Sequence, residues 1–327
     1  MAVSQKQIAE KLNVSIALVS RVLSGKAAEI GIAPETIKRV LNAAQEMGYV
    51  PSAAALALKG KATRTLGVVV YDFKDPFFGA LIEQLQIQAR EHNYSLVLAG
   101  FLNRIPDEQD LRPLHKHALD GLIVIGTDLN ARWLQDFEHL PVARIGHGAP
   151  DEPSVGISVD EDAAARLLVD HLIKTGHKNL LFISADLPAH RLRRKAVEKA
   201  AAVAGATLSA AQSPERGAFE AGVQAAGELP AEVDALICAT DQVAMGVLHA
   251  LSSTGKNIAV TGFDDIEAAR QFIPSITTIR QPIAAMAATA VEAVVQKKAP
   301  VKLSLEPQLI GRKSSGPPSH KGYNPEK

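Results

Sequence analysis

Hydrophobic residues recur at helical spacing in three short stretches near the N-terminus. Ser4 begins a capping-box pattern ahead of the first stretch, and Asn13 fits its C-terminal end. Ser15 is a candidate N-cap for the second helix, and the third is expected to run from Pro34 to Gly48. The pattern predicts three helices before residue 49.

The second predicted helix has two different faces. Val19 and Val22 lie on the side that would face the other two helices. The outward stripe consists of small residues and one arginine: Ile16, Ala17, Ser20, Arg21 and Ser24. Small side chains let a helix approach the DNA major groove closely, and an arginine can donate two hydrogen bonds to guanine. The alternative is an ordinary three-helix bundle with a solvated face.

After residue 64 the chain alternates between short apolar runs and amphipathic segments. Short apolar runs flanked by helices are typical of buried parallel strands. Two sets of such runs predict two doubly wound lobes, with a ligand cleft at the carboxyl ends of the strands. The first set is Leu66–Val70, Leu96–Ala99 and Leu122–Ile125, and the second is Leu180–Ile183, Ala235–Cys238 and Ile258–Thr261.

The charge distribution adds to this picture. The whole chain is neutral, but residues 1–64 carry a net charge of +5 and the remainder carries −5. A basic N-terminal segment fits one surface that faces phosphates. The single cysteine, Cys238, lies in an apolar run and is expected to be a small buried residue. Without a recognisable signal peptide or membrane-spanning run, we expect a cytoplasmic, nucleoid-associated protein with no membrane partner.

No enzyme signature emerges from the sequence. It has neither a phosphate-binding Gly-x-x-x-x-Gly-Lys run nor a Gly-x-Ser-x-Gly elbow. His115 and His117 have no second ligand pair at metal spacing. Asp264 and Asp265 are adjacent, so they point in different directions and do not imply shared acid–base chemistry. We therefore expect no catalytic residues, no metal and no cofactor.

Several motifs, in order and at the expected spacing, resemble the lactose-repressor (LacI/GalR) family of bacterial transcription regulators. The resemblance covers the chain from Val3 to about Gly316 and implies a helix-turn-helix domain, a hinge helix and a two-lobe α/β core like that of periplasmic binding proteins. The motifs are Val14-Ser15, Val19-Ser20-Arg21-Val22-Leu23, Gly48-Tyr49, Asp75-Pro76-Phe77-Phe78, Gly176-His177, Gly262-Phe263-Asp264-Asp265 and Thr277-Thr278-Ile279-Arg280-Gln281-Pro282.

The resemblance implies domain boundaries. The helix-turn-helix would occupy residues 1–49, the hinge 50–61 and the effector-binding and dimerisation core 62–313. Within the core, lobe 1 would comprise about 63–158 and 281–300, and lobe 2 about 159–280 and 301–313. The polar segment 314–327 is expected to be a disordered tail.

The resemblance also implies the residues that contact DNA. In the family, paired hinge helices insert a leucine into the minor groove, and Leu58 matches that position with Lys59 close behind. A simple helical spacer is the alternative for the hinge. Leu18 stands where the family often has threonine. The full expected set is Ser4, Ser15, Ile16, Ala17, Leu18, Ser20, Arg21, Ser24, Ala55, Leu58 and Lys59.

Six residues are expected at the effector site. Phe77 and Phe78 could stack on a ligand, although at least one could serve only core packing. By match to the family, Arg191 is the ligand-binding arginine and Asp264 accepts hydrogen bonds from ligand hydroxyls. Arg191 could instead belong to a solvated basic face. His147 and Thr240 complete the set. Gly146 stands where an acid is usual and Thr240 where an asparagine is usual.

These observations predict a homodimeric transcription regulator, most readily a repressor, that binds a pseudo-palindromic operator. A small-molecule effector of the sugar, sugar phosphate or nucleobase class would act allosterically through the cleft. Two other classes share the core fold. One is a solute-binding protein without catalytic activity, and the other is a sugar- or nucleotide-processing enzyme.

Overall fold

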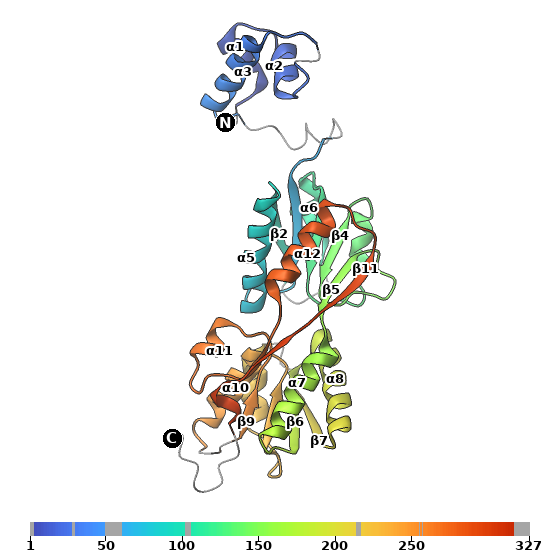
Figure 1. Cartoon of the computed structure of the whole chain (residues 1–327), viewed down its shortest axis with the longest axis vertical. Helices are drawn as coiled ribbons and strands as arrows, with labels where there is room; N and C mark the ends of the chain where they lie inside the picture. The colour runs from blue at the N-terminus through green and yellow to red at the C-terminus, as the bar shows by residue number, and fades with distance from the viewer. Residues whose placement is uncertain are drawn as a thin grey trace. The chain divides into compact units, whose positions relative to one another are not determined.

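The structure is a computed structural model that describes residues 3–27, 30–49, 61–101, 106–213, 217–254, 256 and 258–316. The chain divides into two compact units, residues 1–63 and 64–327. Figure 1 shows a small helical unit and a larger unit built from two α/β lobes.

The small unit is a three-helix bundle formed by α1 (Gln5–Leu12), α2 (Ile16–Leu23) and α3 (Pro34–Glu46). Ser4 accepts a hydrogen bond from the Gln7 backbone and Gln7 reciprocates, which confirms the predicted capping box. Ser15 caps α2 as predicted, with its hydroxyl 3.1 Å from the Leu18 amide. The core of this unit comprises Ile8, Ala9, Val19, Val22, Ala27, Val40, Ala43 and Ala44.

Lobe 1 contains a six-stranded parallel sheet covered on both faces. Helices α5 (Pro76–Glu91) and α12 (Ile283–Val295) pack together on one face, and α6 (Glu108–Lys116) with the 3₁₀ helix Arg132–Phe137 covers the other. The sheet order is β11 (Val301–Leu305), β5 (Val155–Val159), β4 (Val142–Ile145), β3 (Gly121–Ile125), β1 (Thr65–Val70) and β2 (Ser95–Gly100).

The residues of β1 explain why the strand reads as a continuous apolar run. Leu66, Val68 and Val70 belong to the core on the α5 side, whereas Val69 belongs to the cluster on the α6 side. Helices cover both faces of this parallel sheet, so side chains on both sides of the strand are buried. Polar residues therefore do not alternate with apolar ones along the strand.

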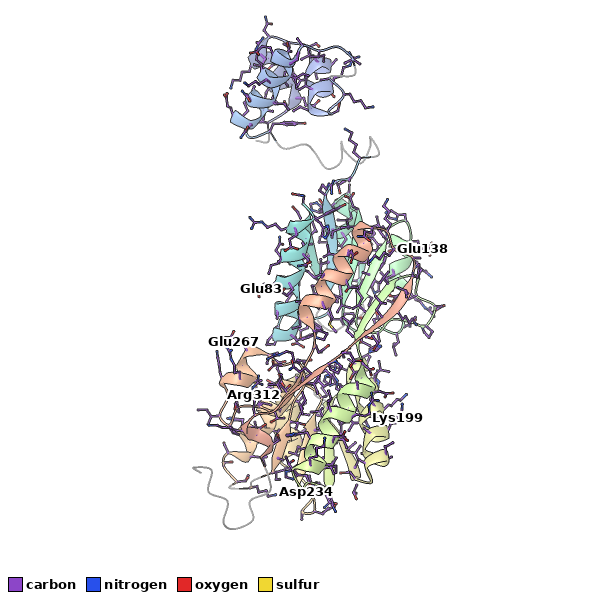
Figure 2. All side chains as sticks on the ribbon, viewed as in Figure 1. Glu83, Glu138, Lys199, Asp234, Glu267 and Arg312 are labelled. Carbon is purple, nitrogen blue, oxygen red and sulfur yellow. The ribbon has the colours of Figure 1, made fainter. Side chains whose placement is uncertain are left out.

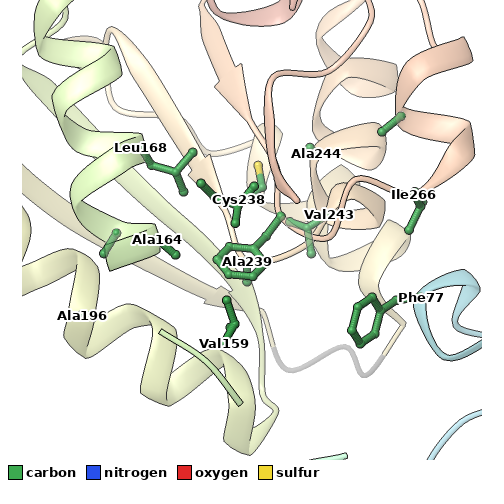
Figure 3. Packing of buried hydrophobic residues seen from close by; sticks show 14 of the residues in the cluster. Phe77, Val159, Ala164, Leu168, Ala196, Cys238, Ala239, Val243, Ala244 and Ile266 are labelled. Atoms are coloured by element: carbon green, nitrogen blue, oxygen red, sulfur yellow. The ribbon is translucent and has the colours of Figure 1, made fainter. Parts of the chain in front are cut away.

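Lobe 2 contains a four-stranded parallel sheet in the order β7 (Thr207–Ser213), β6 (Asn179–Ala185), β8 (Ala235–Cys238), β9 (Ala259–Thr261). Helices α7 (Glu161–Lys174) and α8 (Pro188–Ala204) pack together, as do α9 (Ala218–Ala226) and α10 (Asp241–Leu251), and the short helix α11 spans Glu267–Gln271. Figure 3 shows Leu168, Cys238 and Val243 in the interior of this lobe. Cys238 is a small buried residue, as predicted.

Glycines permit the close packing of α9 against α10. A Cβ added at Gly222 would lie 2.1 Å from the Val243 carbonyl oxygen, and one at Gly246 would lie 2.0 Å from the Phe219 carbonyl oxygen. Both contacts are with backbone, which cannot rotate away. Neither position therefore tolerates a side chain without separating the two helices.

Two of the predicted domain boundaries are wrong. Val301–Leu305 was assigned to lobe 2, but it pairs in parallel with β5 in the lobe 1 sheet. The tail was expected to be disordered from Ser314, but Ser314 and Ser315 are buried. Ser314 accepts a hydrogen bond from the Thr277 amide, and Ser315 donates one to the Thr277 hydroxyl. Small polar side chains fit this site because buried backbone and hydroxyl groups supply their partners.

Two short antiparallel strands flank the second and third crossings between the lobes: one ends just before the second crossing, and the other begins just after the third. They are β10 (Thr278–Arg280) and β12 (Gln308–Ile310). Asp265 forms an ion pair with one arginine of each of the two crossing segments, residues 278–280 and 308–312. Its carboxylate lies 2.6 Å from Arg280 Nε and 2.5 Å from Arg312 Nη2. Arg312 is labelled in Figure 2. Asp265 therefore fastens both crossing segments to lobe 2.

Candidate functional sites

The outward face of α2 is the first candidate site. Ser15, Ile16, Ala17 and Arg21 are exposed, while Leu18, Ser20 and Ser24 are half-buried. The predicted inward residues Val19 and Val22 are buried in the bundle core. Ser4 is exposed at the start of α1. This arrangement presents a side of a helix that is free to enter a groove.

The hinge predictions lie outside the described residues. They concern Ala55, Leu58 and Lys59. These three stay predictions from the sequence.

The second candidate site is a cavity of about 1220 Å³ in the large unit. Its walls come from the carboxyl ends of strands in both lobes, where ligands bind in doubly wound folds. All six residues predicted for the effector site line this cavity, namely Phe77, Phe78, His147, Arg191, Thr240 and Asp264.

The most buried cation of the cavity is Arg193, which the sequence analysis did not select. Its Nε and Nη2 atoms each lie 3.0 Å from an oxygen of Glu161, and its guanidinium lies over the Phe263 ring, 3.2 Å from the centroid. It also donates to the Ala239 carbonyl oxygen. Helical spacing could have identified it. Arg193 lies three residues after His190 and four before Val197, so the three share one face of the helix, and all three are buried.

Arg191, two residues earlier, occupies the rim. Its side chain is 53% exposed and its Nη1 atom lies 2.5 Å from Asp186 Oδ1. Because helical residues two apart do not share a face, only one of the two arginines can point into the interior. The sequence resemblance selected the outer one.

Asp264 is buried and accepts a hydrogen bond from Gln281 Nε2 at 2.7 Å. Its backbone has φ +110° and that of Asp265 has φ +55°, which is uncommon outside glycine. Burial raises the pKa of Asp264 well above its ordinary value, while Arg193 opposes this rise. The side chain of Asp264 therefore faces the cavity while that of Asp265 holds the crossing segments.

Asp241 has a structural role. It lies at the start of α10, where Thr240 is the N-cap. Its carboxylate accepts hydrogen bonds from the Ile266 amide at 2.9 Å and the Thr278 hydroxyl at 2.5 Å. Burial raises its pKa to about 7. Asp241 thus connects α10 to the loop that carries Asp264.

An aromatic pair and a capping carboxylate form the lobe 1 wall. The Phe77 and Phe78 rings are 5.7 Å apart, with Phe77 buried and Phe78 half-buried. Asp75 caps α5 by accepting a hydrogen bond from the Phe77 amide at 2.9 Å. Both rings line the cavity, and Phe77 also belongs to the hydrophobic core.

The glycine at position 146 is required by the backbone. Gly146 has φ +125°, and a Cβ there would lie 2.8 Å from the carbonyl group of Gly126. The acid that is usual at this position in the family would therefore clash with this backbone. His147 beside it is half-buried, and burial lowers its pKa.

The described part of the chain contains no group of three or more histidine, cysteine, aspartate or glutamate residues arranged to hold a metal ion. Within the same ranges, no helix is long and apolar enough to cross a membrane.

Comparison with known proteins places both units. Residues 5–52 match the model of bacterial regulatory proteins of the lacI family, and residues 169–315 match the periplasmic binding protein-like domain. The transcriptional regulator GalS of Salmonella typhimurium is 30% identical over 89% of this chain and 88% of its own length. The repressor PurR of Mannheimia succiniciproducens is 30% identical over 94% and 97%, respectively.

Solved structures show the same fold. The Lac repressor dimer bound to operator and the anti-inducer ONPF has a TM-score of 0.82 at 23% identity and covers 97% of this chain and 100% of its own. The predicted fold class is therefore confirmed. The similarity to GalS and PurR extends over nearly the whole chain, and so this protein belongs to the LacI family of bacterial regulatory proteins and is a helix-turn-helix, DNA-binding transcription regulator.

Proposed function

We propose that the chain acts as a homodimeric repressor that reads a pseudo-palindromic operator and responds to a small polar molecule in the cleft. The observation that carries this proposal is the division of α2 into a buried side, with Val19 and Val22, and an exposed side ending in Arg21. Two copies related by a two-fold axis would present two such helices to successive major grooves.

Relatives support the individual parts of the proposal. PurR is a repressor by name, and the Lac repressor structure is a dimer on its operator. The regulator CelR was solved with cellobiose and an Enterococcus faecium LacI-family regulator with ribose. For this chain, a sugar or sugar derivative in the cleft is the corresponding proposal.

The cleft supplies a physical route for control. Its walls belong to two lobes, with Asp75 and Phe78 on one side and Arg193 and Asp264 on the other. A ligand that contacts both walls stabilises one spacing of the lobes over others. Transmission to the DNA-binding unit would pass through the hinge, where Leu58 is proposed to enter the minor groove.

The first experiment is selection of bound sequences from random duplex DNA with the full-length protein. Enrichment of a pseudo-palindrome supports the regulator. The absence of any enriched motif, with and without a panel of sugars, would favour a solute-binding protein instead.

Arg21→Ala tests the reading helix, with Arg39→Ala as the control. Both side chains are exposed, but Arg39 lies on α3. A bidentate arginine–guanine contact contributes about 1–3 kcal/mol of discrimination. We therefore expect Arg21→Ala to weaken operator binding by roughly tenfold or more while random DNA binding changes little. Equal losses on both DNAs in fluorescence anisotropy would contradict the assignment.

Two further proposals follow from the family. The named relatives are transcription regulators, so we propose that the chain has no catalytic activity and works in the cytoplasm, where its DNA is. Turnover of any ligand that the cleft binds would contradict the first, and fractionation of the cells would test the second.

A further inference from the structure

The two arginines of the cleft are already paired with carboxylates. Arg193 is held by both oxygens of Glu161 at 3.0 Å, and Arg191 lies 2.5 Å from Asp186. Each pair is electrically neutral. A ligand anion would therefore have to displace an existing carboxylate from its arginine in order to gain a charge-assisted contact.

Carboxylates from both lobes line the cleft. Asp75 comes from the start of α5 in lobe 1, and Asp264 comes from lobe 2. Burial raises the pKa of both side chains, and the charge of Asp75 adds to the rise at Asp264, while Arg193 opposes the rise at both. A group that donates hydrogen bonds or carries positive charge would relieve this repulsion.

The remaining described lining residues increase the negative charge. Asp72, Asp128 and Glu220 also line the cavity, against one further cation, Lys74. In total, the described part of the lining has seven carboxylates against the three cations Lys74, Arg191 and Arg193. Burial lowers the pKa of His190 to about 3 and also lowers that of His147, so neither adds positive charge at neutral pH.

Helix N-termini, the other usual binding site for anions, are largely occupied. Asp75 caps α5, and Thr240 caps α10 by accepting from the Val243 amide. Helix α8 begins without a side-chain cap, but it follows directly after Asp186. Each of these N-termini thus has either its own cap or a carboxylate beside it.

We infer that the cleft selects an uncharged or positively charged polyhydroxylated ligand, whose hydroxyl or ammonium groups donate to Asp75 and Asp264, and that it rejects phosphorylated sugars. This rests on the proposed function and narrows its ligand class. Carboxyl oxygens accept hydrogen bonds from hydroxyl and ammonium groups, and the excess of carboxylates over cations in the lining disfavours a dianionic phosphate.

The test uses the full-length protein and matched sets of probes. Glucose, galactose and mannose are each supplied as the neutral sugar, the 2-amino sugar and the 6-phosphate, with cellobiose and ribose as additional neutral sugars. Thermal shift identifies binders and calorimetry measures Kd. In any set that binds, we expect the neutral or amino form to bind roughly tenfold or more tightly than the phosphate. A phosphate that binds more tightly than its parent sugar overturns the inference, and so does a panel in which no neutral or amino sugar binds.

Charge-neutral variants identify the residues responsible. The Asp75→Asn/Asp264→Asn double variant keeps the shape and the α5 cap, because asparagine also caps helices. We expect the discrimination against the phosphate to fall by roughly tenfold. Asp136→Asn removes an exposed carboxylate of lobe 1 outside the cavity and should leave it unchanged. The melting temperature without ligand, measured for the double variant and for each single variant, checks that these proteins are folded. Unchanged discrimination in a folded double variant overturns the assignment.

Together with the DNA selection, the ligand panel separates a failure of the inference on ligand charge from a failure of the proposed function. If a pseudo-palindrome is enriched but a phosphate is the preferred ligand, the inference on charge fails and the regulator stands. If no DNA is enriched but a neutral sugar binds, the proposed function fails and the inference on the cleft stands.

Discussion

The buried pair of Arg193 and Glu161 makes a quantitative prediction. The side chains are only 7% and 13% exposed, and both guanidinium nitrogens are 3.0 Å from the carboxylate. Arg193→Met removes one charge and leaves the other without a partner. Breaking a buried pair in this way costs about 3–5 kcal/mol, because the remaining ion has been removed from water.

The Arg193→Met/Glu161→Gln double variant removes that uncompensated charge. It still leaves the Ala239 carbonyl without its donor, which costs about 1–3 kcal/mol. We therefore expect the double variant to be more stable than Arg193→Met by about 2 kcal/mol. The loss of unfolding free energy in the double variant should therefore be much smaller than the sum of the losses in the two single variants, as expected for residues in direct contact.

The assay is urea unfolding followed by far-UV circular dichroism for the wild type, both single variants and the double variant. The transition of the large unit gives the free energy of unfolding, provided that the slope is the same in all four proteins. If the two single costs simply add in the double variant, the ion pair does not contribute as described. In that case the effect of Arg193 comes from packing on Phe263.

Three further predictions concern packing, pH and the crossing segments. Gly222→Ala should destabilise the protein by about 1–3 kcal/mol, because its Cβ meets the α10 backbone. The control is Gly79→Ala on α5, which should not lower the melting temperature, because its Cβ meets nothing within 4 Å. Equal melting temperatures for the two variants would contradict the close packing of α9 against α10. The pKa of His190 falls from 6.5 to about 3 on folding, so the unfolded chain binds the extra proton and stability should decrease as pH is lowered through this window. His190→Gln should reduce that slope by about 1.4 kcal/mol per pH unit in urea titrations at several pH values, and an unchanged slope would show that the histidine is protonated in the folded state. Asp265→Asn should cost about 3 kcal/mol because Arg312 is nearly buried, while Glu267→Gln, in an exposed pair 3.6 Å from Arg270, should cost under about 0.5 kcal/mol. Similar unfolding midpoints for these two variants would argue against Asp265 as a fastening for the crossing segments.

Local signals were the easiest to read from the sequence. The caps at Ser4 and Ser15 depend on residues three positions away, and both are present in the structure. The apolar runs around Val68 and Ile237 are long enough to identify buried strands. These predictions succeeded because the determining residues are neighbours in the chain.

Features that depend on distant residues were harder to predict. Val301–Leu305 pairs with Val155–Val159, and nothing near residue 301 indicates which lobe supplies that partner. Strand β7, with its alternating small polar and apolar residues, was not predicted as a strand for the same reason. Glu161 was missed because its role depends on Arg193, which lies on another helix.

The adjacency of Asp264 and Asp265 has a consequence for how such regulators diversify. Two adjacent residues supply the carboxyl group that lines the cleft, from Asp264, and the carboxylate that fastens the two crossing segments, from Asp265. A bulky or β-branched residue at position 264 would strain the backbone on which the fastening depends, because φ is +110° there, whereas changes at Asp75 or Phe78 leave that backbone alone. When gene copies diverge to answer new signals, this lineage should acquire new preferences through lobe 1 while the lobe 2 loop stays constant.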